Sequence, residues 1–269
     1  MSFQPVLPTG GLVGWQFLQR TLDAQQESFA RAPDRKRDTD YFRERIATIA
    51  TPAELVADRR LMRVALGAFG LQDDINNRFF IRKMLEEGTR DPGALANRLA
   101  DKRYAAFVTA FDFSSGASER LADPAFADRV VQGFQRQAFE VAVGDQDETL
   151  RLAMTLEREL PQLLDRVSGE DARWLTVLGT PPLRKAFQEA LGLPSAMASL
   201  DLDQQVRIFR DRARSLFGDG AMAQFAQPER REALTQRFLL MAQVQDMREQ
   251  TSPASVALFL LQGASGAQR

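Results

Sequence analysis

Carboxylates are the most abundant side chains in this sequence that could perform catalysis. The chain has 36 Asp and Glu residues but no His and no Cys. Catalytic triads with a histidine base, thiolate nucleophiles and metal sites built from cysteine or histidine are therefore excluded. A carboxylate pair could still serve a glycoside hydrolase, but that chemistry requires a particular separation in space, which sequence spacing does not supply.

One acidic cluster has the composition of a cation-binding loop. Asp145, Asp147 and Glu148 hint at a calcium loop, but the glycine at its turn and the closing glutamate are missing. We interpret Asp145 or Asp147 as a helix cap, with Glu148 in the first turn. The chain also has no G-x-x-x-x-G-K-[ST] phosphate loop and no G-x-S-x-G nucleophile elbow. The prediction is a protein without catalytic residues, metal or cofactor; a carboxylate-dependent hydrolase, such as a wall-remodelling enzyme, is the alternative.

Three arginines are candidates for binding an acidic partner. Arg207, Arg210 and Arg214 are spaced i, i+3 and i+7, so they share one face of a predicted helix. Guanidinium groups in this arrangement could bind carboxylates or phosphates. The alternative is a solvated face whose arginine stems cover apolar surface, with Asp211 balancing part of the charge.

A second set of candidates for partner binding lies near the N-terminus. Trp15, Leu18, Leu22 and Phe29 fall on one stripe at helical spacing, and Gln25 fills the gap in it. This stripe could insert into a groove of another protein. The alternative is that it closes the core of this protein, because two heptads are too few to indicate a coiled coil.

The elements that would carry these residues are predicted to be helices. The chain has 37 Ala and 32 Leu but only 5 Ile and 14 Val, which favours helices over sheets. The 19 Phe residues supply large anchors for packing helices together. The predicted fold class is therefore all-α and multi-helical, with about ten or more helices.

Several helix ends are marked by capping signals. Thr51-Pro52-Ala53-Glu54 combines a threonine cap, a proline at the first helical position and a capping-box glutamate. The helix that follows is expected to run to Phe69, with Phe69 buried and Gly70 in the left-handed conformation that ends a helix. Further predicted caps are Asp101, Asp123 and Asp147.

The two halves of the chain repeat one pattern of helix signals. Thr180-Pro181 starts a helix as Thr51-Pro52 does, and both helices end in Gly-Leu. We expect residues 51–113 and 180–240 to be related units, although two helices rich in alanine and leucine also resemble each other by chance. The predicted organisation is a flexible leader and amphipathic helix (1–35), a first helical unit (36–113), bridging helices (114–165), a second helical unit (166–250) and a C-terminal helix and tail (251–269).

Two segments are predicted to lack regular structure. Residues 1–13 carry no charged side chain and are interrupted by Pro5 and Pro8, so they are expected to form a flexible leader. Residues 31–40 are mostly charged and are expected to form a linker.

Charge and hydropathy limit the classes of partner that are expected. The net charge of -1 argues against a nucleic-acid-binding protein that relies on overall positive charge, and no specific nucleic acid is expected as a partner. No window has about 18 consecutive apolar residues, so no transmembrane segment is predicted. The start of the chain also lacks the basic and apolar regions of a secretory signal.

Residues 41–113 carry a pattern that resembles a known family. It runs from Tyr41-Phe42 to Ile49 and continues through Asp58-Arg59-Arg60-Leu61, Ala68-Phe69-Gly70-Leu71 and the stretch from Ala96 to Phe113. The pattern is similar to the uncharacterised alphaproteobacterial family with domain of unknown function 1217. Members of that family often lie in flagellar gene clusters.

The resemblance implies a flagellar or motility context and supplies no catalytic residue. The predicted function is a non-enzymatic structural, assembly or export-accessory protein that contacts another flagellar protein through helices. The expected location is cytoplasmic by default, with export by the flagellar apparatus or association with the basal body as alternatives. The oligomeric state stays open.

Overall fold

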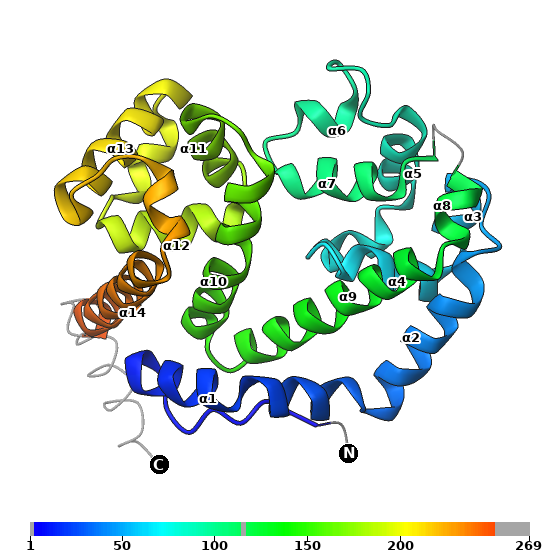
Figure 1. Ribbon diagram of the computed structural model, residues 1–269, viewed down its shortest axis with the longest axis horizontal. Coiled ribbons are helices and arrows are strands. Elements are labelled where there is room, and N and C mark those ends of the chain that lie inside the picture. Colours follow the sequence, from blue (N-terminus) through cyan, green and yellow to red (C-terminus); the bar gives the residue numbers. More distant parts are fainter. Residues whose placement is uncertain (1–2, 114–116, 251–269) are drawn as a thin grey trace, which may run out of the picture.

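The computed structural model describes residues 3–113 and 117–250, and this part of the chain is all-α, as predicted (Figure 1). It contains fourteen α-helices, short 3-10 helices and no strand within the described ranges. The expected C-terminal helix and tail at 251–269 and residues 114–116 lie outside the described residues. The helices are α1 (Gly11–Ala30), α2 (Pro33–Ile46), α3 (Pro52–Ala57), α4 (Arg59–Gly67), η1 (Gln72–Asn76), α5 (Arg78–Glu87), α6 (Leu95–Arg98), α7 (Lys102–Phe111), α8 (Ala117–Ala122), α9 (Pro124–Gly144), α10 (Glu148–Arg166), α11 (Glu170–Leu178), α12 (Pro181–Leu191), η3 (Ser195–Ser199), α13 (Leu202–Phe217), η4 (Met222–Ala226) and α14 (Pro228–Gln250).

Two long helices, α9 and α10, organise the molecule. They are joined by a short turn and diverge from it as the two arms of a V (Figure 1). Helices α2 to α8 lie on the side of α9, and α11 to α14 lie on the side of α10, while α1 runs beneath the V (Figure 1). Among the described residues, no helix is long and apolar enough to cross a membrane.

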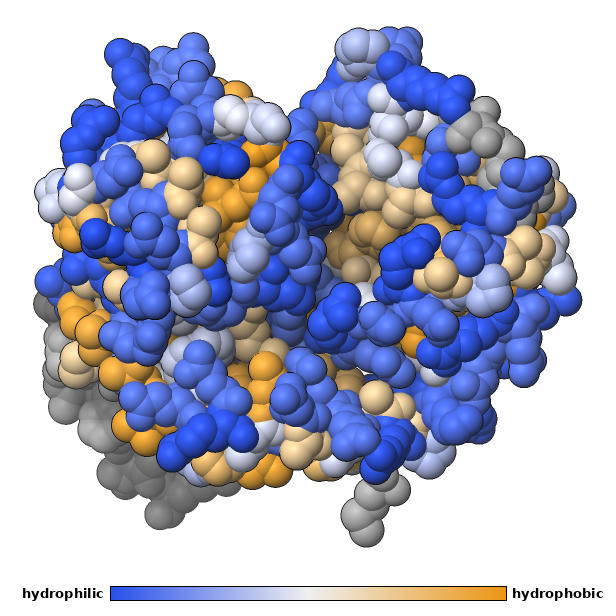
Figure 2. Space-filling view, in the orientation of Figure 1, coloured by the Kyte–Doolittle hydropathy of each residue, from blue (hydrophilic) through white to orange (hydrophobic). Residues whose placement is uncertain are grey.

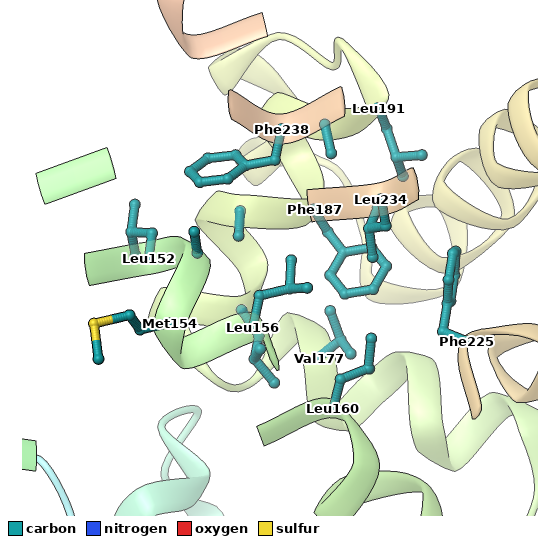
Figure 3. Close-up of a cluster of buried hydrophobic side chains, with 14 of the residues drawn as sticks. Leu152, Met154, Leu156, Leu160, Val177, Phe187, Leu191, Phe225, Leu234 and Phe238 are labelled. Carbon is teal, nitrogen blue, oxygen red and sulfur yellow. The ribbon is translucent and has the colours of Figure 1, made fainter. Parts of the chain in front are cut away.

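Each arm of the V carries its own hydrophobic core. The first core joins α2 to α8 with the first half of α9 and includes the rings of Phe107, Phe111 and Phe126. Phe111 packs edge-on against Phe126, with ring centroids 5.2 Å apart. The second core joins α10 to α14 with α1 and the end of α9. Figure 3 shows its centre, where side chains from α10, α11, α12, η4 and α14 meet.

Helix α9, in the segment predicted to hold bridging helices (114–165), contributes to both cores. Phe126 belongs to the first core and Phe139 of the same helix belongs to the second. The N-terminal helix α1 is part of the second core. It packs against α9, α10 and α14 and completes the second core.

The predicted flexible leader is wrong for its described residues, which are fixed on the protein body. The backbone N–H of Val6 donates to Oε1 of Gln25 at 2.7 Å, and Nε2 of Gln25 donates back to the carbonyl of Val6 at 3.2 Å. Gln146 donates to the carbonyl of Pro5 at 2.9 Å. A segment without charges or periodicity can therefore be ordered by backbone hydrogen bonds, which sequence patterns do not reveal.

The predicted linker at 31–40 is also wrong, because this charged stretch is the first part of α2. Pro33 occupies the first turn, and Lys36 forms an ion pair with Asp40 one turn further on, at 2.6 Å. Phe42 and Ile46 bury the opposite face in the first core. Tertiary packing of a few apolar residues thus makes a highly charged segment helical.

The predicted threonine cap of α3 is confirmed, while the glutamate of the predicted capping box bonds to the residue before the cap instead of to the cap itself. The backbone N–H of Glu54 donates to Oγ1 of Thr51 at 3.2 Å, and the Glu54 carboxylate accepts the N–H of Ala50 at 2.8 Å. The helix does not continue to Phe69, however. Asp58 interrupts it in an extended conformation and caps α4 by accepting the N–H groups of Arg60 and Leu61.

The Thr51→Ala variant is expected to lose about 1 kcal/mol of unfolding free energy, because one N–H of the first turn of α3 loses its acceptor. Urea denaturation measures this change. The matched control is Thr51→Ser, which keeps the hydroxyl and should remain within about 0.5 kcal/mol of the parent chain. Equal stabilities of the alanine and serine variants would contradict a contribution from the cap.

The two halves share an order of elements. Gly70 and Gly192 both have positive φ, at 71° and 66°, as expected for glycines that end helices. Each is followed by a 3-10 helix and then by a longer helix, η1 and α5 in one half and η3 and α13 in the other. Thr180 differs from Thr51, because its side chain donates to the carbonyl of Thr176 and caps nothing. Superposition of residues 51–113 on 180–240 stays a prediction.

Both tyrosines are held by carboxylates in the first half of the chain. Oη of Tyr104 donates to Asp74 and Oη of Tyr41 donates to Asp58, each at 2.6 Å. Burial and then the bond to Asp74 raise the pKa of Tyr104 to about 12. The hydrogen bond to Asp58 raises the pKa of Tyr41 above its usual value.

The phenol of Tyr104 is therefore expected to ionise only near pH 12 in the folded protein. Because the pKa of an unfolded tyrosine is about 10, this contribution to stability is complete below about pH 10 and is lost as the pH rises through 12. Phenolate absorbance during an alkaline titration measures it. Tyr104→Phe should remove the late-titrating group, and a parent titration in which both tyrosines ionise near pH 10 would contradict the prediction.

Candidate functional site

The N-terminal candidates for partner binding lie inside the protein. Trp15, Leu18 and Phe29 are all buried in the second core, and Leu22 is partly buried against it. Phe29 packs edge-on against Phe139, with ring centroids 5.3 Å apart. The structure therefore favours the second alternative for this stripe, which is that α1 closes the core of its own chain.

The arginine candidates on α13 are largely occupied. Arg210 forms an ion pair with Asp171 at 2.6 Å, and Arg214 pairs with Asp211 at 3.2 Å. Arg207 is exposed. The structure does not bring this helix together with the N-terminal stripe, because α13 and α1 lie at opposite ends of the second core (Figure 1).

The acidic cluster at the turn between α9 and α10 acts as a helix cap. Asp147 accepts the backbone N–H of Leu150 at 2.9 Å, which confirms one of the two predicted caps. Glu148 lies in the first turn, where its charge complements the helix dipole. Within the described ranges, no group of three or more acidic side chains is arranged to hold a metal ion.

A recess in the surface lies between the two arms of the V, and we call it the cleft. Figure 2 shows it as a gap between the two halves, with apolar surface recessed in its right-hand wall. It has two adjoining compartments with volumes of about 520 and 470 Å³. Both compartments are lined by Arg103 and Ala106 of α7, Gln137 of α9, and Arg158 and Glu159 of α10.

The charged compartment is the larger of the two and lies towards α12. Arg151 donates two hydrogen bonds to Glu148, at 2.7 and 2.6 Å, and Lys185 lies 3.9 Å from the same carboxylate. The hydrogen bonds from Arg151 lower the pKa of Glu148, although burial opposes them. This carboxyl is therefore ionised at neutral pH, which is the opposite of what a general acid requires.

A buried ion pair joins the two arms beneath the cleft. Glu140 of α9 has only 3% of its surface exposed, and it accepts two hydrogen bonds from Arg158 of α10, at 2.6 and 2.9 Å. Thr155 donates a third bond to the same carboxylate at 3.1 Å. Arg158 also pairs with Glu159. Burial alone would lower the pKa of Arg158, but the bonds to Glu140 raise it above its ordinary value.

The second compartment is an apolar groove edged by arginines, and we call it the arginine-rimmed groove. Phe69 contributes to its floor and is only partly buried, which corrects the expectation of a fully buried core residue. The ring of Phe69 packs edge-on against Phe107, at 5.6 Å between centroids, and its other side faces the groove. The rim is formed by Arg103, Arg120, Arg129, Arg136, Arg158 and Arg166.

Residues 68–230 match a family described as "Protein of unknown function (DUF1217)". This segment is more than half of the 269-residue chain. The chain belongs to this family. The matched segment includes every residue that lines the charged compartment or the arginine-rimmed groove, and it leaves out α1.

A solved structure resembles this DUF1217 protein over most of its length. It is the crystal structure of an Agrobacterium tumefaciens protein, 28% identical in sequence, with a TM-score of 0.73. The match covers 90% of this chain and 99% of the other. No curated protein matches the chain.

The cleft of this DUF1217 protein was not predicted from sequence. Arg129 and Arg136 are seven residues apart on the helix predicted to start at Asp123-Pro124. Residues with this spacing share one face of a helix, by the same rule that grouped Arg207, Arg210 and Arg214. Arg166 could not have been added in this way. It comes from another helix, and only the V of α9 and α10 brings it to the same rim.

Proposed function

We propose that this DUF1217 protein is a non-enzymatic binding protein that holds a helix of a partner protein in the cleft between its two arms. The observation that carries the proposal is the apolar floor of the arginine-rimmed groove, which is open at the surface and is not covered by any side chain of residues 3–113 or 119–248. An exposed apolar recess bordered by polar residues is typical of a protein-binding surface.

The carboxylates of the cleft support binding rather than hydrolysis. Glu140, Glu148 and Glu159 each accept hydrogen bonds from an arginine, and the lowered pKa of Glu148 is unsuited to proton donation. A glycoside hydrolase needs one carboxyl with a raised pKa and another positioned across the substrate. We therefore propose no catalytic role for the cleft.

The proposed setting is the flagellum, where the protein would act in assembly, structure or export. The support for this setting is the resemblance to a family whose members often lie in flagellar gene clusters. In this proposal the contact surface is the cleft rather than the N-terminal stripe. Trp15 and Phe29 are committed to the second core and cannot reach a partner while the fold is intact.

A deletion strain and one blocking variant test both parts of the proposal. Ala106 is exposed on α7 and lines both compartments, so Ala106→Trp should fill the cleft without disturbing either core. The matched control is Ala24→Trp, at an exposed position of α1. We expect the deletion and Ala106→Trp to impair swimming or filament formation, and Ala24→Trp to behave as the parent.

Two outcomes would contradict different parts of the proposal. Normal swimming and normal filaments in the deletion strain would reject the flagellar setting. An impaired deletion strain that is fully restored by Ala106→Trp would instead reject the cleft as the contact surface. Thermal melting of the purified variants checks that both tryptophan substitutions leave the fold intact.

A further inference from the structure

The arginine-rimmed groove has the lining expected of a binding site for a helix. Its volume is about 470 Å³, and its wall is formed by α7, α8, α9, α10 and the turn that follows α4. The floor consists of small or aromatic side chains, namely Ala68, Phe69, Ala110, Phe126 and Val130. A floor of this composition offers apolar contacts but few hydrogen bonds to a bound segment. A helix suits such a floor, because its backbone hydrogen bonds are made within the helix itself.

Three of the six rim arginines are already engaged within the protein. Arg103 forms an ion pair with Asp101 at 2.7 Å, and Arg158 is bound to Glu140 at 2.6 Å. Arg120 lies 3.6 Å from a carboxylate oxygen of Asp112 and donates to the carbonyl of Thr109. These side chains shape the rim but carry little uncompensated charge.

The other three rim arginines carry uncompensated charge. Arg129, Arg136 and Arg166 are exposed, and in the described part of the chain none of them lies within ion-pair distance of a carboxylate. The carboxylate that lines this groove is Glu159, which is bound by Arg158. The rim is therefore locally basic although the whole chain has a net charge of -1.

The spacing of two of these arginines predicts how far apart the acidic side chains of a bound helix should be. Arg129 and Arg136 are seven residues apart on α9, which corresponds to about two helical turns or about 10.5 Å along the axis. Val130 and Gly133 lie between them and face the same groove. A second helix aligned with α9 would present acidic side chains at the same distance if they were also seven residues apart.

We infer that the arginine-rimmed groove binds an amphipathic helix of a partner protein through its apolar stripe, with acidic side chains two turns apart that meet Arg129 and Arg136. The inference rests on the proposed function and names the chemistry of the partner. The apolar floor favours a helix over a nucleic acid, whose phosphates could engage the arginines but would leave Phe69 and Val130 uncovered.

A display library of amphipathic helical peptides, with a fixed apolar stripe and randomised flanking positions, tests this inference on the full-length protein. We expect the selected peptides to be enriched in Asp and Glu at positions seven residues apart. Fluorescence anisotropy of one selected peptide then gives affinities. Arg129→Glu/Arg136→Glu should weaken binding on the order of tenfold, and binding should weaken as salt is raised.

Two controls make the experiment specific. Arg207→Glu reverses an exposed arginine on α13, far from the groove, and should leave the affinity unchanged. A peptide in which the two acidic residues are replaced by arginine should bind the parent poorly and should regain affinity for Arg129→Glu/Arg136→Glu. If the arginine-containing peptide binds Arg129→Glu/Arg136→Glu, the two charged positions of the peptide lie opposite residues 129 and 136.

The outcomes separate the inference from the proposed function. Selection of neutral or basic helices, or equal affinity of the acidic peptide for the parent and the double variant, overturns the acidic partner while leaving helix binding in place. Failure to select any helix overturns both. Displacement of the peptide by a single-stranded oligonucleotide, with loss of oligonucleotide binding in the double variant, would assign the groove to nucleic acid instead.

Discussion

Deletion of residues 1–30 is expected to prevent cooperative folding of the second core. The deletion removes α1, whose Trp15, Leu18 and Phe29 side chains are buried in that core. Burial of three such side chains contributes roughly 5–9 kcal/mol, which is comparable to the entire stability of an ordinary domain. The truncated chain should therefore show no sharp thermal transition for the second core.

A point substitution measures the same contribution in the intact chain. Phe29→Ala is expected to lower the unfolding free energy by about 3–5 kcal/mol, because the ring packs against Phe139 and leaves a cavity when it is removed. The matched control is Phe79→Ala, since Phe79 is 73% exposed and should cost less than about 0.5 kcal/mol. If the truncated chain melts as the parent does and Phe29→Ala is neutral, α1 is a contact element after all.

Glu140→Ala is the second substitution expected to have a large effect. It leaves the largely buried guanidinium of Arg158 without the carboxylate that accepts two of its hydrogen bonds, so that Glu159 is its remaining carboxylate partner among the described residues. Removing one partner of a buried ion pair typically costs about 3–5 kcal/mol, and the retained pair with Glu159 should place this loss near the lower end of that range. Chemical denaturation measures the loss, and Glu44→Ala, at an exposed position on α2, serves as the matched control.

A double variant separates the charge from the packing. In Glu140→Leu/Arg158→Met both charged groups of the buried pair are replaced by apolar side chains, and the charge left without its arginine is that of the partly exposed Glu159. We expect it to recover much of the stability lost in Glu140→Ala, since apolar replacements of buried pairs are often neutral or stabilising. A double variant as unstable as Glu140→Ala would show that the hydrogen bonds to Thr155 and Arg158 hold the arms together by geometry that apolar packing does not replace.

The features of the fold that could be predicted are those decided within a few residues. The caps at Thr51 and Asp123 and the positive φ of Gly70 depend on neighbours three or four positions away, and the sequence displays those neighbours directly. The all-α class follows from composition in the same way, because propensity sums over local choices.

The features that could not be predicted depend on contacts between distant segments. Residues 31–40 become helical because α2 packs in the first core, and Gln25 orders the leader through the backbone of Val6. The stripe on α1 had the pattern of an interaction surface and of a core helix at once. Only the position of α9, α10 and α14 around it decides between them.

The candidate site was hidden for a further reason. The groove includes ordinary residues, such as Ala106 and Gln162, that no spacing in the sequence marks as members of a site. Its properties arise from the angle between α9 and α10, which sequence patterns do not encode. The family resemblance pointed to the correct family, but a family of unknown function supplies no site residues to search for.

The position of α1 has a consequence for the order in which the two cores can fold during synthesis. The first core is built from one continuous segment between α2 and the middle of α9, so it can form while the rest of the chain is still being synthesised. The second core is closed by α1 and α14, which come from opposite ends of the described chain. Helix α1 therefore leaves the ribosome before the other helices of the second core, and its packing there can be completed only after α14 has been synthesised.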